Sequence, residues 1–382
     1  IYICMSEVNA WNELNLKENL LRGIYSYGFE IPSPIQKKAI KPIIEGNDVI
    51  AQAQSGTGKT GAFTVSLLQN IDESKNEVQG IIMAPTRELA IQIHKVLESI
   101  GTFLDNFKTT VLIGGNHVND DIKTLTDNKP QIVVGTPGRI HDLIRRKKID
   151  TKTVKCLILD EADEMLSVGF KEQVYNIFQF MESNIQIMLF SATLPIEIQN
   201  LTDKFMREPI KILVRNEAIT LEGIIQYYIA LEDDNEKYET LKDLFQVISV
   251  SQCIIYCNSI KRVSDLYEAL RKDNFPVTAI HGNMSKSERL SAYDDFVKGS
   301  SRVLISSNLT ARGIDVQQVS VVINFDIPKD IHTYIHRIGR SCRWGKKGMG
   351  INFITKRDIR KMKEIEQYYN TQIIEMPANL SV

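Results

Sequence analysis

The chain of 382 residues is longer than one ordinary domain, and a prior of about 150 residues per domain suggests two or three domains. Apolar residues make up 43% of it, enough for substantial cores, and the net charge of −1 excludes a global attraction to nucleic acid or acidic lipid. The five scattered cysteines predict a reduced, intracellular chain without a disulfide framework. No apolar run approaches the ~20 residues of a membrane span, so no membrane partner is expected.

Two helices are predicted at the start of the chain. Apolar residues recur at helical spacing from residue 11 to residue 27, and Gly28 is expected to end that helix. A second helix opens near Gln36 and is expected to end near Gly46.

A loop that holds nucleotide phosphates is predicted at AQSGTGKT, residues 53–60. It follows an apolar strand and precedes a helix, the layout in which backbone N–H groups and the positive helix end surround phosphates. Lys59 is expected to hold the β- and γ-phosphates of ATP, and the Thr60 hydroxyl to ligate Mg²⁺. The predicted contacts are Ser55, Gly56, Thr57, Gly58, Lys59 and Thr60. The usual pattern opens with Gly where this chain has Ala53, and a loop that merely turns is the alternative.

Short apolar runs then alternate with helical stretches. In the first half the runs are 79–84, 109–113, 131–134, 154–159 and 185–190. This alternation predicts an α/β fold with a parallel sheet covered by helices on both faces. The pattern breaks around residues 208–222 and then starts afresh, which predicts a domain at 1–215, a linker at 216–222 and a domain at 223–382. The second half has strand candidates at 226–230, 253–256, 277–280, 303–305, 319–325 and 349–354, with helices at 260–272 and 286–296.

An acidic cluster, residues 160–163, follows the apolar strand 154–159. Asp160 is expected to bind Mg²⁺ through water, and Glu161 to orient or deprotonate the attacking water. The alternative is that these carboxylates only stabilise the positive end of the following helix.

The acidic cluster reads DEAD, and the chain resembles the DEAD-box RNA helicases of superfamily two. Further matches follow in the order of that family at residues 28–36, 85–90, 114–115, 136–139, 191–193, 311–315 and 336–343. The resemblance implies two RecA-like domains, ATP and Mg²⁺ as ligands, and RNA-stimulated ATP hydrolysis coupled to local, non-processive unwinding. It is greatest to members that act in translation initiation, through segments such as NLKENLLRGIY and GIDVQQVS. These members imply a cytoplasmic protein with scaffold or regulatory partners; a nuclear exon-junction relative that clamps RNA is the alternative.

The resemblance also assigns roles in the ATP site. Gln36 would read the adenine edge, and Phe29 would stack on the base. Without the other motifs, Gln36 would be interpreted as a solvent-facing side chain and Phe29 as a core residue. Ser191, Thr193 and His336 would couple the ATP state to RNA, with a helix cap as the alternative for the first two. In the second half, Gly313 and Asp315 would bind the nucleotide, and Arg340 and Arg343 would reach the γ-phosphate, unless the arginines form a solvated helix face.

RNA contacts are implied for three loops of the first half and for one residue of the second half. They are Pro85, Thr86, Arg87, Gly114, Gly115, Thr136, Pro137, Gly138, Arg139 and Arg289. Small residues suit this role because backbone N–H groups approach phosphates without reading bases. The basic run at residues 145–148 is either a further RNA patch or a solvated face.

Four positions depart from the family pattern. They are Ile31, Lys286, Asn308 and Cys342. The phosphate chemistry does not depend on these positions. In the second half, Asn308 removes a charge and Cys342 adds a side chain in a tight turn, which are changes expected to affect RNA coupling.

Overall fold

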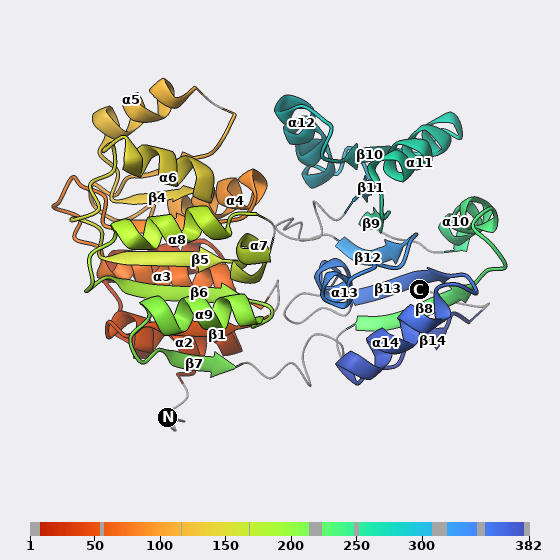
Figure 1. Ribbon diagram of the computed structural model, residues 1–382, viewed down its shortest axis with the longest axis horizontal. Helices are drawn as coiled ribbons and strands as arrows, with labels where there is room; N and C mark the ends of the chain where they lie inside the picture. The colour runs from red at the N-terminus through yellow and green to blue at the C-terminus, as the bar shows by residue number, and fades with distance from the viewer. Residues whose placement is uncertain are drawn as a thin grey trace. The chain divides into compact units, whose positions relative to one another are not determined.

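The computed structural model describes residues 8–53, 57–115, 117–167, 169–213, 224–247, 252–307, 319–341 and 348–377. The chain divides into two compact units, Ile1–Arg215 and Asn216–Val382 (Figure 1). The predicted linker at 216–222 lies outside the described residues.

The first unit is built on a seven-stranded, fully parallel sheet in the order β3-β4-β2-β5-β6-β1-β7. Every residue of β2, β4 and β5 is buried, because helices cover both faces and continuous apolar runs suit such strands. The strands are β1 (Val49–Gln52), β2 (Gly80–Met83), β3 (Thr109–Leu112), β4 (Ile132–Gly135), β5 (Cys156–Asp160), β6 (Gln186–Ser191) and β7 (Ile210–Leu213).

Each face of this sheet has its own apolar core. One core packs under α1 (Glu18–Ser26), α2 (Pro34–Ile44), α3 (Lys59–Asn70) and α4 (Arg87–Ile100). The other packs under α5 (Val118–Asn128), α6 (Pro137–Arg145), α7 (Ala162–Ser167), α8 (Lys171–Phe180) and α9 (Ile196–Phe205). The predicted α/β fold class is confirmed in this unit.

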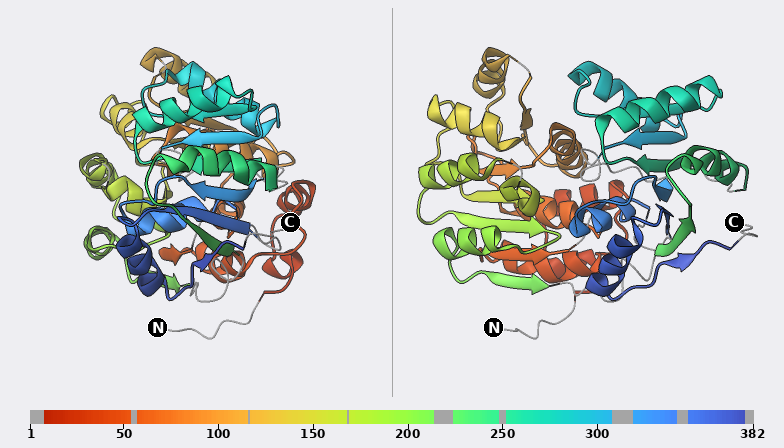
Figure 2. Two further views of the ribbon diagram at one scale, coloured as in Figure 1. Left: turned by 90° about the vertical axis from the view of Figure 1, so that its right-hand side faces the viewer. Right: turned by 45° about the vertical axis from the view of Figure 1, so that its right-hand side comes forward.

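The second unit repeats the architecture, with helices on both sides of a sheet (Figure 2). This sheet is parallel and has the order β10-β11-β9-β12-β13-β8-β14. Its strands are β8 (Ile224–Ala230), β9 (Gln252–Tyr256), β10 (Val277–Ile280), β11 (Val303–Ser306), β12 (Val319–Asn324), β13 (Gly348–Ile354) and β14 (Ile374–Glu375). One face carries α10 (Glu236–Val247) and α11 (Ile260–Lys272). The other carries α12 (Lys286–Val297), α13 (Ile331–Ile338) and α14 (Ile359–Tyr369).

The first predicted helix is wrong because it is interrupted. A 3₁₀ helix at Trp11–Leu14 ends at Asn15, whose φ of 50° is left-handed, and α1 begins only at Glu18. Lys17 fixes the interruption, since its N–H donates to Gln69 Oε1 and its Nζ to the Ile71 carbonyl, each at 2.8 Å. Helical periodicity cannot reveal an anchor that lies on another helix.

Strand β7 lies where the sequence predicts a break. Its Ile210 N–H donates to the Asp48 carbonyl at 2.8 Å, and Ile212 is its one buried residue. A strand at the edge of a sheet needs little apolar surface, so its sequence signal is weak. None of the helices in the described segments has the length and apolar character that crossing a membrane requires.

Candidate nucleotide site and RNA interface

The predicted site residues of the first unit gather at one edge of its sheet. All strands are parallel, so their carboxyl ends meet at this edge, where ligands bind in such folds. The neighbours β5, β6 and β1 end at Asp160, at Ser191 and at the loop to Lys59. The neighbours β3, β4 and β2 lead into the three predicted RNA loops. The predicted nucleotide residues therefore occupy one half of the edge, called the nucleotide half, and the predicted RNA loops occupy the other half.

The phosphate loop passes directly into α3. Gly58, just before the first helical residue Lys59, has a left-handed φ of 99°. A Cβ at Gly58 would lie 2.5 Å from Ser33 Oγ and 2.8 Å from Gln36 Nε2, so both space and backbone geometry require glycine there. Two loop residues are partly exposed, Thr57 and Thr60, and two lie outside the described residues, Ser55 and Gly56.

Gln36 ties α2 to the phosphate loop. Its side-chain oxygen accepts the Ser33 N–H at 2.7 Å, and its Nε2 donates to the Gly58 carbonyl at 3.1 Å. The buried amide that is predicted to read adenine is thus held next to the predicted phosphate contacts.

Phe29 lies beside this amide. Its ring stacks on Trp11 with an interplanar angle of 11° and a centroid separation of 6.1 Å. A Cβ at Gly61 would lie 2.8 Å from the Phe29 ring and 2.5 Å from Gln36 Nε2. Gly61 is therefore part of the predicted adenine pocket, although the loop pattern does not include it.

Lys59 and Glu161 form a buried ion pair. Lys59 Nζ lies 3.2 Å from Glu161 Oε1, and the side chains are 5% and 4% exposed. Glu161 has a φ of 52°, which is uncommon for a residue other than glycine and is often found at functional sites. The ammonium predicted to hold phosphates is thus paired with the carboxylate predicted to activate water.

Asp160 ends β5 as a buried carboxyl group that accepts the Glu161 N–H at 3.0 Å. Burial raises the pKa of Asp160 to about 7; the nearby Lys59 opposes this shift, and Glu161 and Asp163 add to it. The Asp160 carboxylate and the Thr60 hydroxyl are the oxygen ligands that Mg²⁺ prefers. Within the described residues no group of three or more His, Cys, Asp or Glu could hold a metal. Mg²⁺ held by Asp160 and Thr60 would need water and phosphate oxygens as its further ligands.

Asp163 joins the start of α7 to the segment after β6. Its Oδ2 accepts the Thr193 N–H at 3.2 Å and the Thr193 hydroxyl at 2.7 Å. Ser191 Oγ accepts the Asp163 N–H at 3.2 Å and donates to the Thr193 carbonyl at 2.7 Å. Ser191 and Thr193 therefore belong to one network with the acidic cluster. Neither residue caps α9, because Pro195 occupies its N-cap position.

Two of the predicted RNA loops follow β2 and β3. Thr86 caps α4, since its Oγ1 accepts the Leu89 N–H at 3.2 Å, and Pro85 before it is buried. A Cβ at Gly114 would lie 3.4 Å from the Arg87 guanidinium, so these two loops meet. Gly115, also in the second loop, is exposed and has a left-handed φ of 96°.

The third predicted RNA loop follows β4 and begins α6. The Thr136 N–H donates to the Leu112 carbonyl at 3.2 Å, which holds this loop against β3. Pro137 is buried, whereas Gly138 is exposed and has no atom within 4 Å of where a Cβ would lie. The surface there is open to the approach of another chain.

Arg139 differs from its neighbours in this loop. Its Nη1 donates to Asp121 Oδ2 on α5, and the side chains are 9% and 7% exposed. Its charge is therefore directed into the protein.

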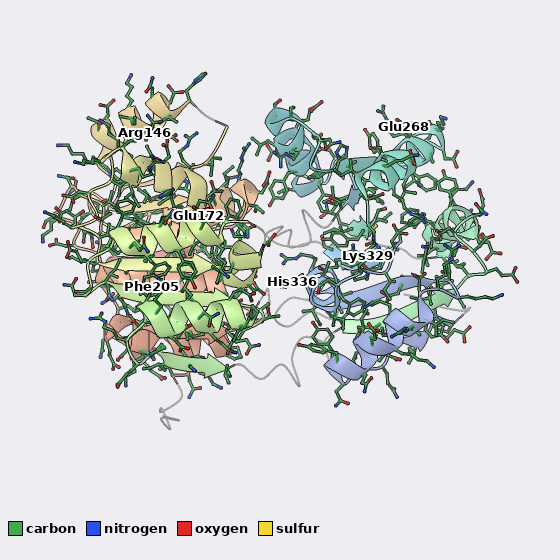
Figure 3. All side chains as sticks on the ribbon, in the orientation of Figure 1. Arg146, Glu172, Phe205, Glu268, Lys329 and His336 are labelled. Carbon is green, nitrogen blue, oxygen red and sulfur yellow. The ribbon has the colours of Figure 1, made fainter. Side chains whose placement is uncertain are left out.

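The basic run at residues 145–148 lies at the opposite end of α6 from this loop. Arg146 is exposed (Figure 3) and pairs with Asp142 one turn earlier at 2.9 Å. A helix of nine residues is ~13 Å long, so the run is well separated from Thr136. This position favours a solvated face.

In the second unit, α13 carries His336 and leads to Arg340 (Figure 3). Arg340 Nε donates to the His336 carbonyl at 3.2 Å. Arg289 lies partly buried in the first turn of α12. Three predicted nucleotide ligands lie outside the described residues: Gly313, Asp315 and Arg343. Two positions that depart from the family pattern also lie outside them, namely Asn308 and Cys342.

Comparison with known families identifies both units. Residues 33–201 match the DEAD/DEAH box helicase model, and residues 236–345 match the helicase conserved C-terminal domain. The chain is 54% identical to ATP-dependent RNA helicase eIF4A of Neurospora crassa over 98% of this chain and 94% of that protein. The chain belongs to the DEAD/DEAH box helicase family. The Pyricularia oryzae eIF4A is 53% identical to this helicase over the same shares of both chains.

Solved structures of similar helicases include S. cerevisiae Dbp5 bound to RNA and ADP BeF3. It has a TM-score of 0.89 and 32% identity and covers 96% of this helicase and 95% of its own chain. Mss116p bound to ssRNA and AMP-PNP has a TM-score of 0.87 and 30% identity, covering 98% of this helicase and 80% of its own chain.

One contact at the nucleotide half of the edge carries no signal in the helicase motifs. Gln52, the last residue of β1, donates from Nε2 to the Ala192 carbonyl at 3.1 Å, and the Ala53 N–H donates to the Ser191 carbonyl at 3.0 Å. These bonds join the strand before the phosphate loop to the segment that contains Ser191 and Thr193. Only the parallel pairing of β1 with β6 reveals them.

A second contact without a predicted role is made by Arg337, which lies within the matched segment 336–343 of the second unit. Its buried guanidinium donates to Asn324 Oδ1 at 3.0 Å and to Asn258 Oδ1 at 2.8 Å. It also lies 5.2 Å from the centre of the Tyr256 ring. Arg337 and Arg340 are both buried, so these two arginines do not form a solvated helix face.

Proposed function

We propose that this DEAD-box chain is an ATP-dependent RNA helicase in which RNA-stimulated ATP hydrolysis drives local, non-processive strand separation. The observation that carries the proposal is the sheet edge where the Lys59–Glu161 pair, Asp160 and the loops after β2, β3 and β4 occur together. The identity of 54% to a protein named an ATP-dependent RNA helicase supports it.

In the proposed reaction, ATP takes the place of Glu161 at the Lys59 ammonium. The β- and γ-phosphates accept from Lys59, and backbone N–H groups of residues 55–58 complete their surroundings. Glu161 is then free to orient or deprotonate the attacking water. Mg²⁺, held by Asp160 and Thr60 largely through water, would neutralise charge on the phosphates.

The adenine is proposed to bind at Gln36 and Phe29. The amide can donate to and accept from the Watson–Crick edge of adenine, and the ring offers an aromatic surface for stacking. Because Gly61 has no side chain, both groups can pack closely against the start of α3.

The second unit is proposed to complete the catalytic site. Gly313 and Asp315 would bind the ribose side of the nucleotide, and Arg340 and Arg343 would stabilise the charge that grows on the γ-phosphate. An arginine in this role accounts for a rate factor of about 10³ to 10⁵ in related enzymes.

RNA is proposed to bind through its sugar–phosphate backbone. Apart from Arg139, whose charge is paired with Asp121, the residues named for RNA contact are glycines, threonines, prolines and two arginines, which suit phosphate contacts without base reading. We expect affinity to depend on ATP and salt but hardly on base sequence, with RNA preferred over DNA through the 2′-hydroxyl.

The biological role that we propose is unwinding of messenger RNA during translation initiation in the cytoplasm, with scaffold proteins that orient the two units. The similarity to curated eIF4A proteins supports this role. An RNA clamp would instead hold RNA in the ATP state and turn over little.

The test is multiple-turnover ATPase with saturating RNA, together with unwinding of a short duplex. We expect the wild type to turn over many ATP molecules, and Lys59→Ala to abolish nucleotide binding or hydrolysis because no neighbouring group can replace its ammonium. An ATPase rate equal to wild type in Lys59→Ala would contradict the proposed nucleotide site. A single slow turnover by the wild type would favour the alternative that the protein is an RNA clamp.

A further inference from the structure

Helix α5 follows the Gly114-Gly115 loop at the edge of the sheet and is attached by little apolar surface. Its buried side chains are Asp121 and Leu125, one turn apart on the same face. Val118 and Ile122 pack partly against the core on that face. A carboxylate therefore occupies a position in the buried stripe where an apolar residue is expected.

The partner of this carboxylate is Arg139, which lies in the first turn of α6, one residue after Gly138. Its Nη1 donates to Asp121 Oδ2, and both side chains are more than nine-tenths buried. An ion pair so little exposed is weakly screened, and removing one partner leaves an uncompensated charge in the protein. The pair thus joins two helices whose first turns lie next to two predicted RNA loops.

We propose that Arg139 and Asp121 form a clamp that fixes the spacing of these two RNA loops, and that Arg139 is a positioning residue, not a phosphate ligand. The clamp deepens the proposed function, because it rests on RNA binding by the loops at residues 114–115 and 136–138. Successive phosphates of an RNA strand have a fixed spacing, so loops held at a fixed separation bind them without first losing conformational freedom.

The salt dependence of RNA binding distinguishes the clamp from a direct contact between Arg139 and an RNA phosphate. A guanidinium that neutralises one phosphate releases counterions, so its loss lowers the slope of log K against log salt by about 0.7 for a single strand. The charge of Arg139 is already balanced by Asp121. Its loss should weaken RNA binding without changing that slope.

The experiment measures RNA affinity of the full chain in a non-hydrolysable ATP analogue over a range of salt concentrations. We expect Arg139→Gln and Asp121→Asn each to weaken RNA binding by roughly 3- to 30-fold. Both variants should keep the wild-type salt slope. RNA-stimulated kcat at saturating RNA should stay near wild type while the RNA concentration for half-stimulation rises.

The double variant Asp121→Leu with Arg139→Met tests whether an apolar contact between α5 and α6 can replace the ion pair. Apolar residues of similar volume often replace a buried ion pair without loss, so this variant should bind RNA more tightly than either single variant. A phosphate ligand cannot be replaced by methionine. A double variant as weak as Arg139→Gln would therefore overturn the clamp.

The pair Asp142–Arg146 on the same helix gives a matched control, because it is exposed and lies at the far end of α6. Exchanging its two charges should leave RNA affinity unchanged. Thermal unfolding and binding of the ATP analogue establish that each variant is folded.

Two results would show that Arg139 is a phosphate ligand and overturn the clamp. They are a lower salt slope in Arg139→Gln and tighter RNA binding in Asp121→Asn, where the arginine is released. Failure of the wild type to bind RNA would instead overturn the proposed function and the clamp with it.

Discussion

Lys59 and Glu161 neutralise each other, because Lys59 Nζ lies 3.2 Å from Glu161 Oε1 and both side chains are little exposed. The pairing lets two charged groups be buried before the ligand arrives, since an unpaired charge there would be far more costly. In the proposed reaction ATP displaces Glu161 from Lys59, which would link phosphate binding to release of the proposed catalytic base.

Glu161→Gln tests this link. The amide keeps the shape but has no negative charge with which to hold Lys59 or to activate water. We expect ATP and RNA to remain bound, with ATP affinity equal to or above wild type, while hydrolysis slows strongly in a single-turnover assay. A loss of ATP affinity would contradict the proposed role of Glu161.

Asp160 makes the nucleotide-free chain sensitive to pH. Burial raises its pKa from the ordinary value of 3.8 to about 7, so between these values the folded chain holds a proton that the unfolded chain has lost. The free energy of unfolding therefore falls as pH rises through this window and is lowest above it. Asp160→Asn removes this effect.

We accordingly expect Asp160→Asn to have a higher Tm than wild type at about pH 8 without nucleotide, and a smaller advantage at about pH 5. Scanning calorimetry at both pH values measures this. Addition of ATP and Mg²⁺ is the control, because it should stabilise the wild type more than the variant. An equal Tm difference at both pH values would refute the assigned shift.

At the scale of elements, the proposed coupling between the ATP state and RNA binding depends on which strands are neighbours in the sheet. The parallel pairing of β1 with β6 brings Gln52 to the Ala192 carbonyl, and Asp163 of α7 binds the same segment at Thr193. The segment after β6 is thus held from the phosphate-loop strand and from the acidic cluster.

Gln52→Leu removes the first of these attachments while keeping the side-chain volume. We expect ATP to bind as in wild type, but RNA stimulation of the ATPase to fall by roughly 3- to 30-fold. The matched control is Gln199→Leu, which removes an exposed amide bond to the Leu194 carbonyl. Unchanged RNA stimulation in Gln52→Leu would show that the Asp163 network suffices.

At the scale of the molecule, two units with the same architecture divide the proposed residues between them. The phosphate loop, Asp160 and Glu161 belong to the first unit, and Arg340 and Arg343 to the second. Neither unit holds the full set. RNA that favours an active arrangement of both would stimulate hydrolysis by shifting that population.

We therefore expect residues 1–215 alone to bind nucleotide weakly and to fail to hydrolyse it, even with RNA. The full chain with Arg340→Ala and Arg343→Ala should show a loss of about 10³ to 10⁵ in rate. Either protein hydrolysing ATP at the RNA-stimulated wild-type rate would contradict a catalytic site that needs both units.

The sequence by itself determined the features that rest on local pattern. Short apolar runs predicted the parallel strands, and the Gly-rich segment with Lys59 and the acidic cluster after β5 predicted the edge at which the site would form. Periodicity and turn chemistry are properties of neighbouring residues, so they can be read without a structure.

Only the tertiary structure decided which groups are partners. It paired Lys59 with Glu161, directed Arg139 to Asp121, brought Gln52 to Ala192, and interrupted the first predicted helix where Lys17 reaches α3. Each of these contacts joins residues far apart in the chain. Burial and charge balance are set by such contacts, and no local pattern contains them.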